Sequence, residues 1–575
     1  MFSNKKKQTA TQMIRSNFFK YKRYFFEAVL ATIIINILTL ATSLFSMQVY
    51  DRVIPTHGLS TLTTLGIGVV VMIIFEFILK FVRSSIMDNV TYGLDNIYSR
   101  NIYKRLLNIK LNKLPTSVGS LSSQLKSYET IRGFLSSSTI FLFVDTPFAI
   151  LYILLLAFIG SPWLSVVSFT FFMIALFVGL WLKFKIKKHT QEGAKYSNIK
   201  VGELVETIQG MEIIKSRNGE NKFLSRWMRT SKASIVNDIT MKHLNENTVY
   251  IAALMQQLGY ATIIIIGAYL VVDGAMTMGA LIACSIISGR IMAPVAALPG
   301  LLSQMSHSKS ALEGIEQIYS LQGDFEDVST PIKPEKISGN YRLSDIEFAY
   351  NKNAIALNIK DFEIKAGDKV AILGTIGSGK STLLKLLTGL YGVDQGRVYV
   401  DNLDISHLDR EILSKCVGYM PQESRLFQGT LKENLLIGTS NITDEQLKTI
   451  CEKTGLITMV STHPQGFEMP IFEGGVGLSV GQRQLVSITR LFLSRPNVWL
   501  LDEPTASMDG QLELRTMQLL QHNIKPEDTL VLVTHKPNLL AIVNKILVIN
   551  NGQIYMYGDK NQVLAQLSQQ NITQG

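Results

Sequence analysis

A glycine-rich run that ends in lysine and serine, GTIGSGKS at residues 374–381, has the spacing of a phosphate-binding loop. It follows the apolar run KVAIL at residues 369–373 and precedes a helical pattern at residues 382–390. Such a loop requires this order of strand, loop and helix, because its backbone N–H groups bind phosphate at the N-terminus of the helix. The run therefore predicts a nucleotide site rather than a simple glycine turn.

The residues in and just after this loop would each contact a different part of the nucleotide. Lys380 would reach the β- and γ-phosphates, and the hydroxyl of Ser381 would ligate Mg²⁺. The other residues of the loop that we expect to contact ATP are Gly374, Gly377, Gly379 and Thr382.

Two carboxylates follow a second apolar run, VWLL at residues 498–501. In P-loop hydrolases an aspartate in this position holds Mg²⁺, and we assign that role to Asp502. Glu503 is then placed to orient and deprotonate the attacking water. An acidic pair alone could also be a solvated strand end, but downstream of a phosphate-binding loop it indicates ATP hydrolysis.

Four further motifs follow the phosphate-binding loop, namely MPQE at 420–423, LSVGQRQ at 478–484, SMD at 507–509 and the histidine that follows the strand LVLV at 530–533. With them, residues 340–560 resemble the ATPase domain of ABC transporters. This resemblance implies that LSVGQRQ is the family's signature motif, which closes over ATP bound by the loop of a partner domain. The residues that would contact ATP in this way are Ser479, Gly481, Gln482 and Asp509.

The same resemblance assigns three more residues. Gln422 would sense the nucleotide, help to hold Mg²⁺ and couple the site to the membrane, and His535 would contact the γ-phosphate beside Glu503. Tyr350 would stack on adenine. The signature departs from the family pattern at Val480, where the family has glycine, and this valine is expected to reduce turnover rather than to abolish it.

The composition indicates a membrane protein. Apolar residues make up 47% of the 575 residues and charged residues only 18%, which excludes a disordered, collagen-like or disulfide-rich chain. Three distant cysteines predict neither a disulfide framework nor a zinc site. A bilayer core of about 30 Å needs about 20 apolar residues of helix. Six runs qualify, at residues 28–49, 62–79, 139–158, 163–182, 249–272 and 278–302.

The charges indicate how these spans are oriented. Residues 1–330 carry a net charge of +12 and residues 331–575 a net charge of −1. Because basic residues collect on the cytoplasmic side of a membrane, both termini, the long loops and the ATPase are predicted to be cytoplasmic. The basic half is thus explained by membrane topology and lipid rather than by nucleic acid. No small-residue cleavage site follows the first span, which is interpreted as uncleaved.

The predicted fold class is a polytopic α-helical membrane domain of six transmembrane helices fused to an α/β P-loop nucleotide-binding domain. Charged and apolar residues alternate at helical spacing in the long loops 80–135 and 183–247, so these loops should extend the spans as helices. Separate small loop domains are the alternative. The predicted domain bounds are 1–27 for the cytoplasmic N-terminal segment, 28–321 for the membrane domain, 322–338 for the linker and 339–575 for the ATPase.

The membrane half contains three distinctive segments, namely MQVYDRVIP at 47–55, FVDTPF at 143–148, and GALI at 279–282 followed by SGRIMAP at 288–294. These segments resemble the exporters of type I secretion systems. This resemblance implies an ATP-driven exporter of unfolded polypeptides in the inner membrane of a Gram-negative cell. It also implies a dimer, a periplasmic adaptor (membrane fusion protein) and a TolC-type outer-membrane channel. Many relatives carry an N-terminal leader peptidase. Only 27 residues precede the first span here, so we expect no leader-peptidase activity.

Several alternatives stay open at the level of sequence. An ABC exporter of lipids, drugs or small peptides would share every ATPase motif. A non-hydrolytic regulator is disfavoured, because both Glu503 and His535 are present. Complete motifs make a homodimer sufficient, whereas Val480 leaves room for a heterodimer with a better signature.

Ionisable residues inside the spans are costly in lipid. Glu76, Asp145 and Arg290 must therefore face other helices or water, as lining of a transport path, as structural pairs, or by snorkelling towards the membrane surface. Small residues and prolines in the second and sixth spans would allow close helix contact, kinks or a hinge, and these are Gly66, Gly68, Pro294 and Pro299.

Overall fold

The computed structural model describes residues 9–115, 117–134, 137–324, 330–351, 354–439 and 441–573. The N-terminal segment and the linker predicted above extend partly outside these residues. The described chain forms two compact units. The helical unit contains residues up to 107 and 115–321, and the α/β unit contains residues from 322 onward together with the short segment 108–114.

All six predicted spans lie in the helices of the helical unit. Among the described residues, four helical segments are long and apolar enough to cross a membrane, namely Lys22–Thr56, Leu59–Leu107, Pro162–Gln209 and Glu220–Val272. Shorter apolar helical stretches, Asp145–Ile159 and Met278–Pro294, fall in the third and sixth predicted spans. The elements are α1 (Ala10–Lys20), α2 (Lys22–Leu38), α3 (Ala41–Gln48), the π-helical turn η1 (Val49–Val53), α4 (Ile54–Thr56), α5 (Leu59–Leu107), α6 (Val118–Lys126), α7 (Tyr128–Phe134), α8 (Ser137–Ile159), α9 (Pro162–Gln209), α10 (Met211–Ser216), α11 (Glu220–Val272) and α12 (Met278–Ser320).

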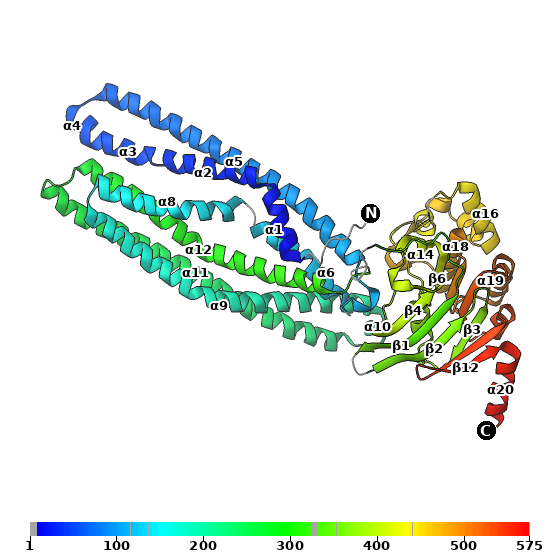
Figure 1. Cartoon of the computed structure of the whole chain (residues 1–575). Helices are drawn as coiled ribbons and strands as arrows, with labels where there is room; N and C mark the ends of the chain where they lie inside the picture. Colours follow the sequence, from blue (N-terminus) through cyan, green and yellow to red (C-terminus); the bar gives the residue numbers. More distant parts are fainter. Residues whose placement is uncertain are drawn as a thin grey trace. The chain divides into compact units, whose positions relative to one another are not determined.

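The long loops are mostly helical, as predicted, although the first is interrupted between α5 and α6. α5, α9 and α11 each continue without a break from an apolar span into the charged sequence beside it, for 49, 48 and 53 residues. α9, α11 and α12 run side by side through the unit (Figure 1). The alternative of separate loop domains is therefore wrong. α12 also continues as a helix through both of its prolines.

The apolar core of the bundle lies between α8, α9, α11 and α12. Its most buried side chains include Leu156, Leu164, Ile263 and Ile287, each fully buried. In contrast, the most hydropathic stretch of α5 buries none of its residues against the chain. Apolar side chains on this surface are in place to contact lipid or a partner helix.

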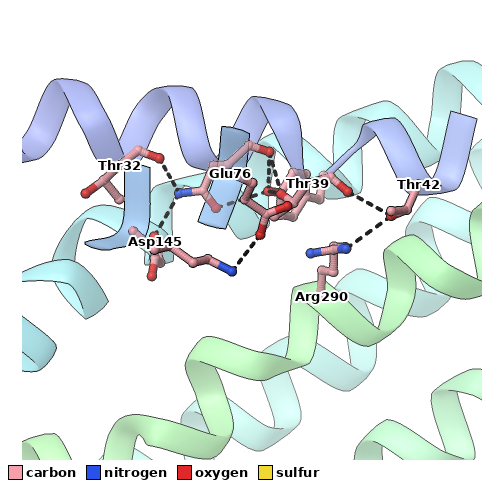
Figure 2. A network of polar contacts seen from close by, with 9 residues as sticks. Thr32, Thr39, Thr42, Glu76, Asp145 and Arg290 are labelled. Atoms are coloured by element: carbon pink, nitrogen blue, oxygen red, sulfur yellow. Dashed lines mark hydrogen bonds and ion pairs between the residues drawn. The ribbon is translucent and has the colours of Figure 1, made fainter. Parts of the chain in front are cut away.

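Polar side chains join the first span to the third and sixth spans (Figure 2). The Asn36 amide on α2 donates to Asp145 on α8 at 2.8 Å, and the hydroxyl of Tyr152 on α8 donates to the carbonyl of Asn36 at 2.9 Å. Arg290 on α12 donates to Thr42 on α3 at 3.3 Å. These hydrogen bonds give polar groups a partner that lipid could not provide. Asp145 and Arg290 thus each form a structural pair with a residue of the first span.

Glu76 differs from the other two ionisable residues, because its partner lies on its own helix. Its carboxylate accepts from Lys80, four residues further along α5, at 2.6 Å (Figure 2). Lys80 is half exposed. The pair thus follows the i, i+4 spacing of a helix and requires no second span.

A carboxylate clasp joins the C-terminal end of the first span to the start of α12. Asp51, in the π-helical turn η1, accepts from the backbone N–H of Gly279 and from the hydroxyl of Thr277, each at 2.7 Å. Thr277 also caps α12 through the N–H of Ala280. The negative charge lies at the positive end of the helix dipole, which stabilises both. The clasp connects two of the motifs that resemble type I exporters.

Gly279→Ala tests the clasp, because the glycine leaves no room for a side chain. A Cβ there would lie 2.3 Å from the carbonyl oxygen of Met47, so alanine should push η1 away from α12. We expect a loss of about 1–3 kcal/mol, the usual cost of overpacking, measured as a lower midpoint of thermal unfolding in detergent. Gly66→Ala is the matched control, because a Cβ at Gly66 meets nothing within 4 Å. Equal stability of the two variants would contradict the clasp.

The α/β unit contains two main sheets. A six-stranded sheet has the order β12-β11-β3-β10-β9-β6, with β11, β3, β10, β9 and β6 parallel, and a four-stranded antiparallel sheet has the order β2-β1-β4-β5. The short strands β7 and β8 pair with each other. The central strands are buried on both faces, which explains their continuous apolar runs. Phosphate-binding loops of α/β sheets lie at the carboxyl ends of such strands.

The bounds of these elements are as follows. The strands are β1 (Tyr341–Asn351), β2 (Ala354–Ile364), β3 (Lys369–Gly374), β4 (Gln395–Val400), β5 (Leu403–Asp404), β6 (Val417–Met420), β7 (Gly429–Thr430), β8 (Pro470–Ile471), β9 (Val498–Asp502), β10 (Thr529–Val533), β11 (Lys545–Asn550) and β12 (Gln553–Asp559). The α-helices are α13 (Lys380–Leu387), α14 (Arg410–Cys416), α15 (Leu431–Leu435), α16 (Asp444–Thr454), α17 (Ile457–Thr462), α18 (Val480–Ser494), α19 (Gly510–Asn523) and α20 (Lys560–Thr573). Short 3₁₀ turns complete the α/β unit.

Candidate nucleotide site

The glycine-rich loop joins β3 to α13, as its sequence predicts. Gly374 has φ of +154°, and a Cβ there would lie 2.2 Å from the carbonyl oxygen of Ile549. Gly379 has φ of +101°, and a Cβ would lie 2.7 Å from the carbonyl oxygen of Ala356. Only glycine fits both positions. Gly377 has φ of +80° and faces open space, where a ligand could approach the backbone.

Lys380 begins α13 and folds back into this loop. Its ammonium donates to the carbonyl oxygens of Gly374 at 2.8 Å and Thr375 at 2.9 Å. Burial lowers the pKa of Lys380, and the nearby carboxylates of Glu503 and Asp502 oppose that change. The cation therefore lies within the loop that would enclose the phosphates.

Asp502 and Ser381 meet beside the loop. Asp502 ends β9 and is almost fully buried, with 3% of its surface exposed. Burial raises the pKa of Asp502, and a hydrogen bond from Ser381 opposes the rise. A hydroxyl and a desolvated carboxylate are oxygen ligands of the kind that Mg²⁺ takes, so these two residues fit the ion.

Two side chains from distant parts of the chain, His535 and Gln422, converge at Glu503. Its carboxylate lies 3.5 Å from Nε2 of His535 and accepts from the amide of Gln422 at 3.4 Å. β9 and β10 are parallel neighbours, so the residues that follow them reach the same edge of the sheet. Gln422, which follows β6, contacts Glu503 rather than the pair Ser381 and Asp502.

The backbone at Glu503 has an unusual conformation, which sets the direction of its carboxylate. Glu503 has φ of +48°, a left-handed conformation that is uncommon for residues other than glycine. Its N–H donates to the carbonyl of Val533 at 2.9 Å, which anchors the turn to β10. Strained backbone of this kind is concentrated at functional sites. The side chain is 22% exposed, so its carboxylate can reach a water molecule.

Tyr350 lies near the end of β1, against α13. Its hydroxyl is 2.9 Å from the hydroxyl of Thr382, and its ring packs edge-on against Phe348 and Tyr391 at 5.2 and 6.0 Å between centroids. About half of Tyr350 is exposed, at 53%. An exposed aromatic surface next to the phosphate loop is suited to stacking on a base.

The signature residues lie at the start of α18. Ser479 caps the helix, and its capping box with Gln482 has bonds of 2.8 and 3.1 Å. A Cβ on Gly481 would lie 2.7 Å from the carbonyl oxygen of Ser507, so only glycine fits there. Among the described residues, no hydrogen bond or ion pair joins the start of α18 to the phosphate loop. Asp509 caps α19 through the N–H of Leu512 at 2.8 Å.

Sequence reasoning missed Gln484, the last residue of the signature run. Only 2% of its surface is exposed. Its amide donates to the carbonyl of Glu503 at 3.5 Å and accepts from the N–H of Ser507 at 3.0 Å. Gln484 thus ties the signature helix to the turn that carries Glu503. A glutamine on the apolar side of an amphipathic helix was the available signal.

A second missed feature connects the site to segment 108–114. Lys113 pairs with Asp394 at 3.3 Å, and Asn112 donates to the carbonyl of Gly392 at 3.0 Å. Asp394 also accepts from the N–H of Ala349, next to Tyr350, at 3.1 Å. The segment between α5 and α6 therefore touches the loop that supports the predicted adenine site.

Comparison with known proteins agrees with this geometry. Residues 357–506 match the family model described as ABC transporter, and residues 25–295 match the model described as ABC transporter transmembrane region. The chain is 26% identical over 556 residues to the cyclolysin secretion/processing ATP-binding protein CyaB of Bordetella pertussis, covering 95% of this chain and 76% of that protein. It is 25% identical over 547 residues to the leukotoxin translocation ATP-binding protein LktB of Mannheimia haemolytica, covering 95% and 77%.

The structure also resembles a solved exporter. A bacterial Atm1-family ABC exporter with ATP bound aligns with a TM-score of 0.85 at 19% identity, covering 95% of this chain and 96% of that one. At this identity the likeness concerns the fold alone.

Proposed function

The chain belongs to the ABC transporters, with an ABC transmembrane region and an ABC ATPase in one polypeptide, and from that premise we propose a role in type I secretion. It is an exporter that couples ATP hydrolysis to transport. The proposed cargo is an unfolded polypeptide that crosses the bacterial inner membrane. One observation carries this proposal, the similarity over 95% of the chain to proteins named for secreting cyclolysin and translocating leukotoxin.

In the proposed mechanism the phosphate loop positions ATP for attack by water. The loop's N–H groups and the Lys380 ammonium bind the phosphate oxygens, while the ring of Tyr350 stacks on adenine. Glu503 accepts the proton of the attacking water, and its contacts with Gln422 and His535 fix the direction of its carboxylate. His535 then lies within reach of the transferred phosphoryl group.

Ser381 and Asp502 would hold Mg²⁺, with the amide oxygen of Gln422 as a further ligand once ATP is bound. The ion would neutralise charge that develops on the phosphate oxygens. The buried carboxylate of Asp502 next to the hydroxyl of Ser381 supports this role.

A dimer would complete the site. Ser479, Gly481, Gln482 and Asp509 would contact ATP held by the phosphate loop of a second chain. A homodimer is sufficient, because this chain carries both halves of the site. A heterodimer with a second ABC chain is the alternative.

The proposed assembly spans the cell envelope. The protein would lie in the inner membrane with both termini and the ATPase in the cytoplasm, in agreement with the basic charge of its first half. A periplasmic adaptor and a TolC-type outer-membrane channel would carry the cargo onward. The bounds 1–27, 28–321, 322–338 and 339–575 remain our proposed division into N-terminal segment, membrane domain, linker and ATPase.

The proposal is tested by ATP hydrolysis of the purified chain in liposomes. The probe is reduced and carboxymethylated α-lactalbumin, which cannot fold, compared with the native folded protein and with a fluorescent phospholipid. We expect only the unfolded polypeptide to raise the rate of phosphate release. Stimulation by the phospholipid alone would overturn the proposal in favour of a lipid exporter.

Val480→Gly tests the one departure in the signature. Val480 is 53% exposed in the first turn of α18, so the valine fits its own chain and its bulk would face the partner's ATP. We expect ATP turnover to rise by about 2- to 5-fold, which corresponds to less than about 1 kcal/mol. Val480→Ala should give an intermediate rate. A fall in both variants would mean that the valine side chain makes a useful contact.

A further inference from the structure

A large groove opens in the helical unit, apart from the ATPase site. Its volume is about 1210 Å³, and its walls come from α6, α7, α9, α11 and α12. The lining residues belong to the charged continuations of the spans, between residues 122 and 314, rather than to the apolar runs. α9, α11 and α12 run alongside one another here (Figure 1).

Most of the residues that line this groove have polar side chains, and the charges of its lysines and carboxylates balance. Nine of its residues are serine or threonine, and four are asparagine or glutamine. The lining contains three lysines and three acidic residues, so their positive and negative charges cancel. Six residues are apolar. Pockets for drug-sized ligands are smaller, about 300–1000 Å³, and are lined mainly by hydrophobic and aromatic residues, whereas most residues that line this groove have polar side chains.

Some of the polar groups hold the walls in place. The His189 ring on α9 lies 2.9 Å from the amide of Asn237 on α11, and Ser123 on α6 donates to Asn198 on α9 at 2.6 Å. These bonds cross between helices. They fix the walls of the groove without filling it.

Other polar groups are available to a ligand. Within the described part of the chain, the hydroxyls of Ser197, Ser303 and Ser310 have no hydrogen-bond partner. The amide oxygen of Asn245 is buried and also lacks a partner among the described residues. A hydroxyl both donates and accepts, so the three serines can bind an N–H or a C=O, whereas the amide oxygen of Asn245 can accept from an N–H.

We propose that this groove receives an extended segment of the transported polypeptide and binds chiefly its backbone. This inference rests on the proposed function and deepens it. An unfolded chain presents one N–H and one C=O per residue, whatever its sequence. A wall of hydroxyls and amides with balanced charge can pair with these groups without selecting particular side chains. A lipid tail or an apolar drug would leave the same groups unsatisfied, which costs free energy.

The test is photo-crosslinking in the full-length protein in liposomes. The photoreactive residue p-benzoylphenylalanine replaces Ser197 on α9 or Ser310 on α12. The matched control is Ile239 on α11, which is 48% exposed and lies two residues beyond Asn237, on the other side of the helix. The probe is biotinylated, carboxymethylated α-lactalbumin, with a fluorescent phospholipid in a parallel sample.

We expect biotin to attach at Ser197 and Ser310 and not at Ile239, and excess unlabelled carboxymethylated protein to remove the signal. Labelling at Ile239 alone, labelling by phospholipid at the two serines, or a crosslink between two copies of this chain at those positions would each overturn the assignment.

A blocking variant separates this inference from the proposed function. The double substitution Ser197→Trp and Ser310→Trp should abolish the stimulation of ATP hydrolysis by the unfolded polypeptide, whereas Ile239→Trp should retain it. If wild-type protein is stimulated and the double variant is stimulated equally, the groove assignment fails and the proposed function stands. If wild-type protein is not stimulated at all, both fail.

Discussion

Glu503→Gln is expected to lower ATP hydrolysis by about 10²- to 10⁴-fold, the usual contribution of a general base. Glutamine keeps the size of the side chain and can still contact Gln422 and His535, but its amide cannot accept the proton of the attacking water. ATP should therefore still bind. The measurements are phosphate release for hydrolysis and retention of a fluorescent ATP analogue for binding.

The same variant should trap the closed dimer, because bound ATP is not consumed. Native mass spectrometry of the detergent-solubilised protein should find two chains with two nucleotides. Glu423→Gln is the matched control, since Glu423 is an exposed glutamate next to Gln422 and has no contact with Glu503 among the described residues. Hydrolysis by Glu503→Gln at the rate of this control would exclude Glu503 as the base.

Lys380→Ala is expected to weaken ATP binding itself. The change removes an ammonium that lies inside the phosphate loop, within 2.9 Å of two of its carbonyl oxygens. A hydrogen bond to a charged group contributes about 1.5–3 kcal/mol, so affinity should fall by about 10- to 100-fold. The measurement is a titration with fluorescent ATP, together with the rate of hydrolysis, which should be lost.

Lys385→Ala is the control for this substitution. Lys385 is a lysine on the same helix, but its ammonium lies over the ring of Tyr391, 5.1 Å from the centroid, and not in the loop. ATP affinity of Lys385→Ala should stay close to that of the wild type. Equal losses in the two variants would indicate a general effect on α13. Unchanged affinity in Lys380→Ala would contradict the role of Lys380.

The variants Glu503→Gln and Lys380→Ala should differ in ATP binding, although both should lose ATP hydrolysis. Glu503→Gln should bind ATP without hydrolysing it, whereas Lys380→Ala should fail at the earlier step. This difference follows from where the two side chains lie, one inside the loop and the other at the edge of the sheet beyond it.

The sequence by itself determined those features that depend on residues close together in the chain. The loop at 374–381 needs glycines at particular positions of one short turn, and φ and close contacts at Gly374 and Gly379 bear this out. The apolar runs determined the spans, because hydropathy over about 20 residues is a local property. Helical spacing likewise determined that the long loops would be helices.

Only the tertiary structure decided which distant residues meet. Gln422 and Glu503 are 81 residues apart, and Asp51 and Gly279 are 228 residues apart, yet each pair is in contact. From the sequence, Glu76, Asp145 and Arg290 could not be told apart, because all three are ionisable residues inside predicted spans. The structure separates them, since Glu76 pairs along its own helix while Asp145 and Arg290 bond to the first span.

The physical reason is the range of the interactions. Backbone propensity and hydropathy act over a few residues and leave a pattern in the sequence. The hydrogen bonds of Gln484, the Asp51 clasp and the polar groove depend on how helices and strands pack. Packing brings together side chains that no spacing rule connects, so these features exist only in the folded chain.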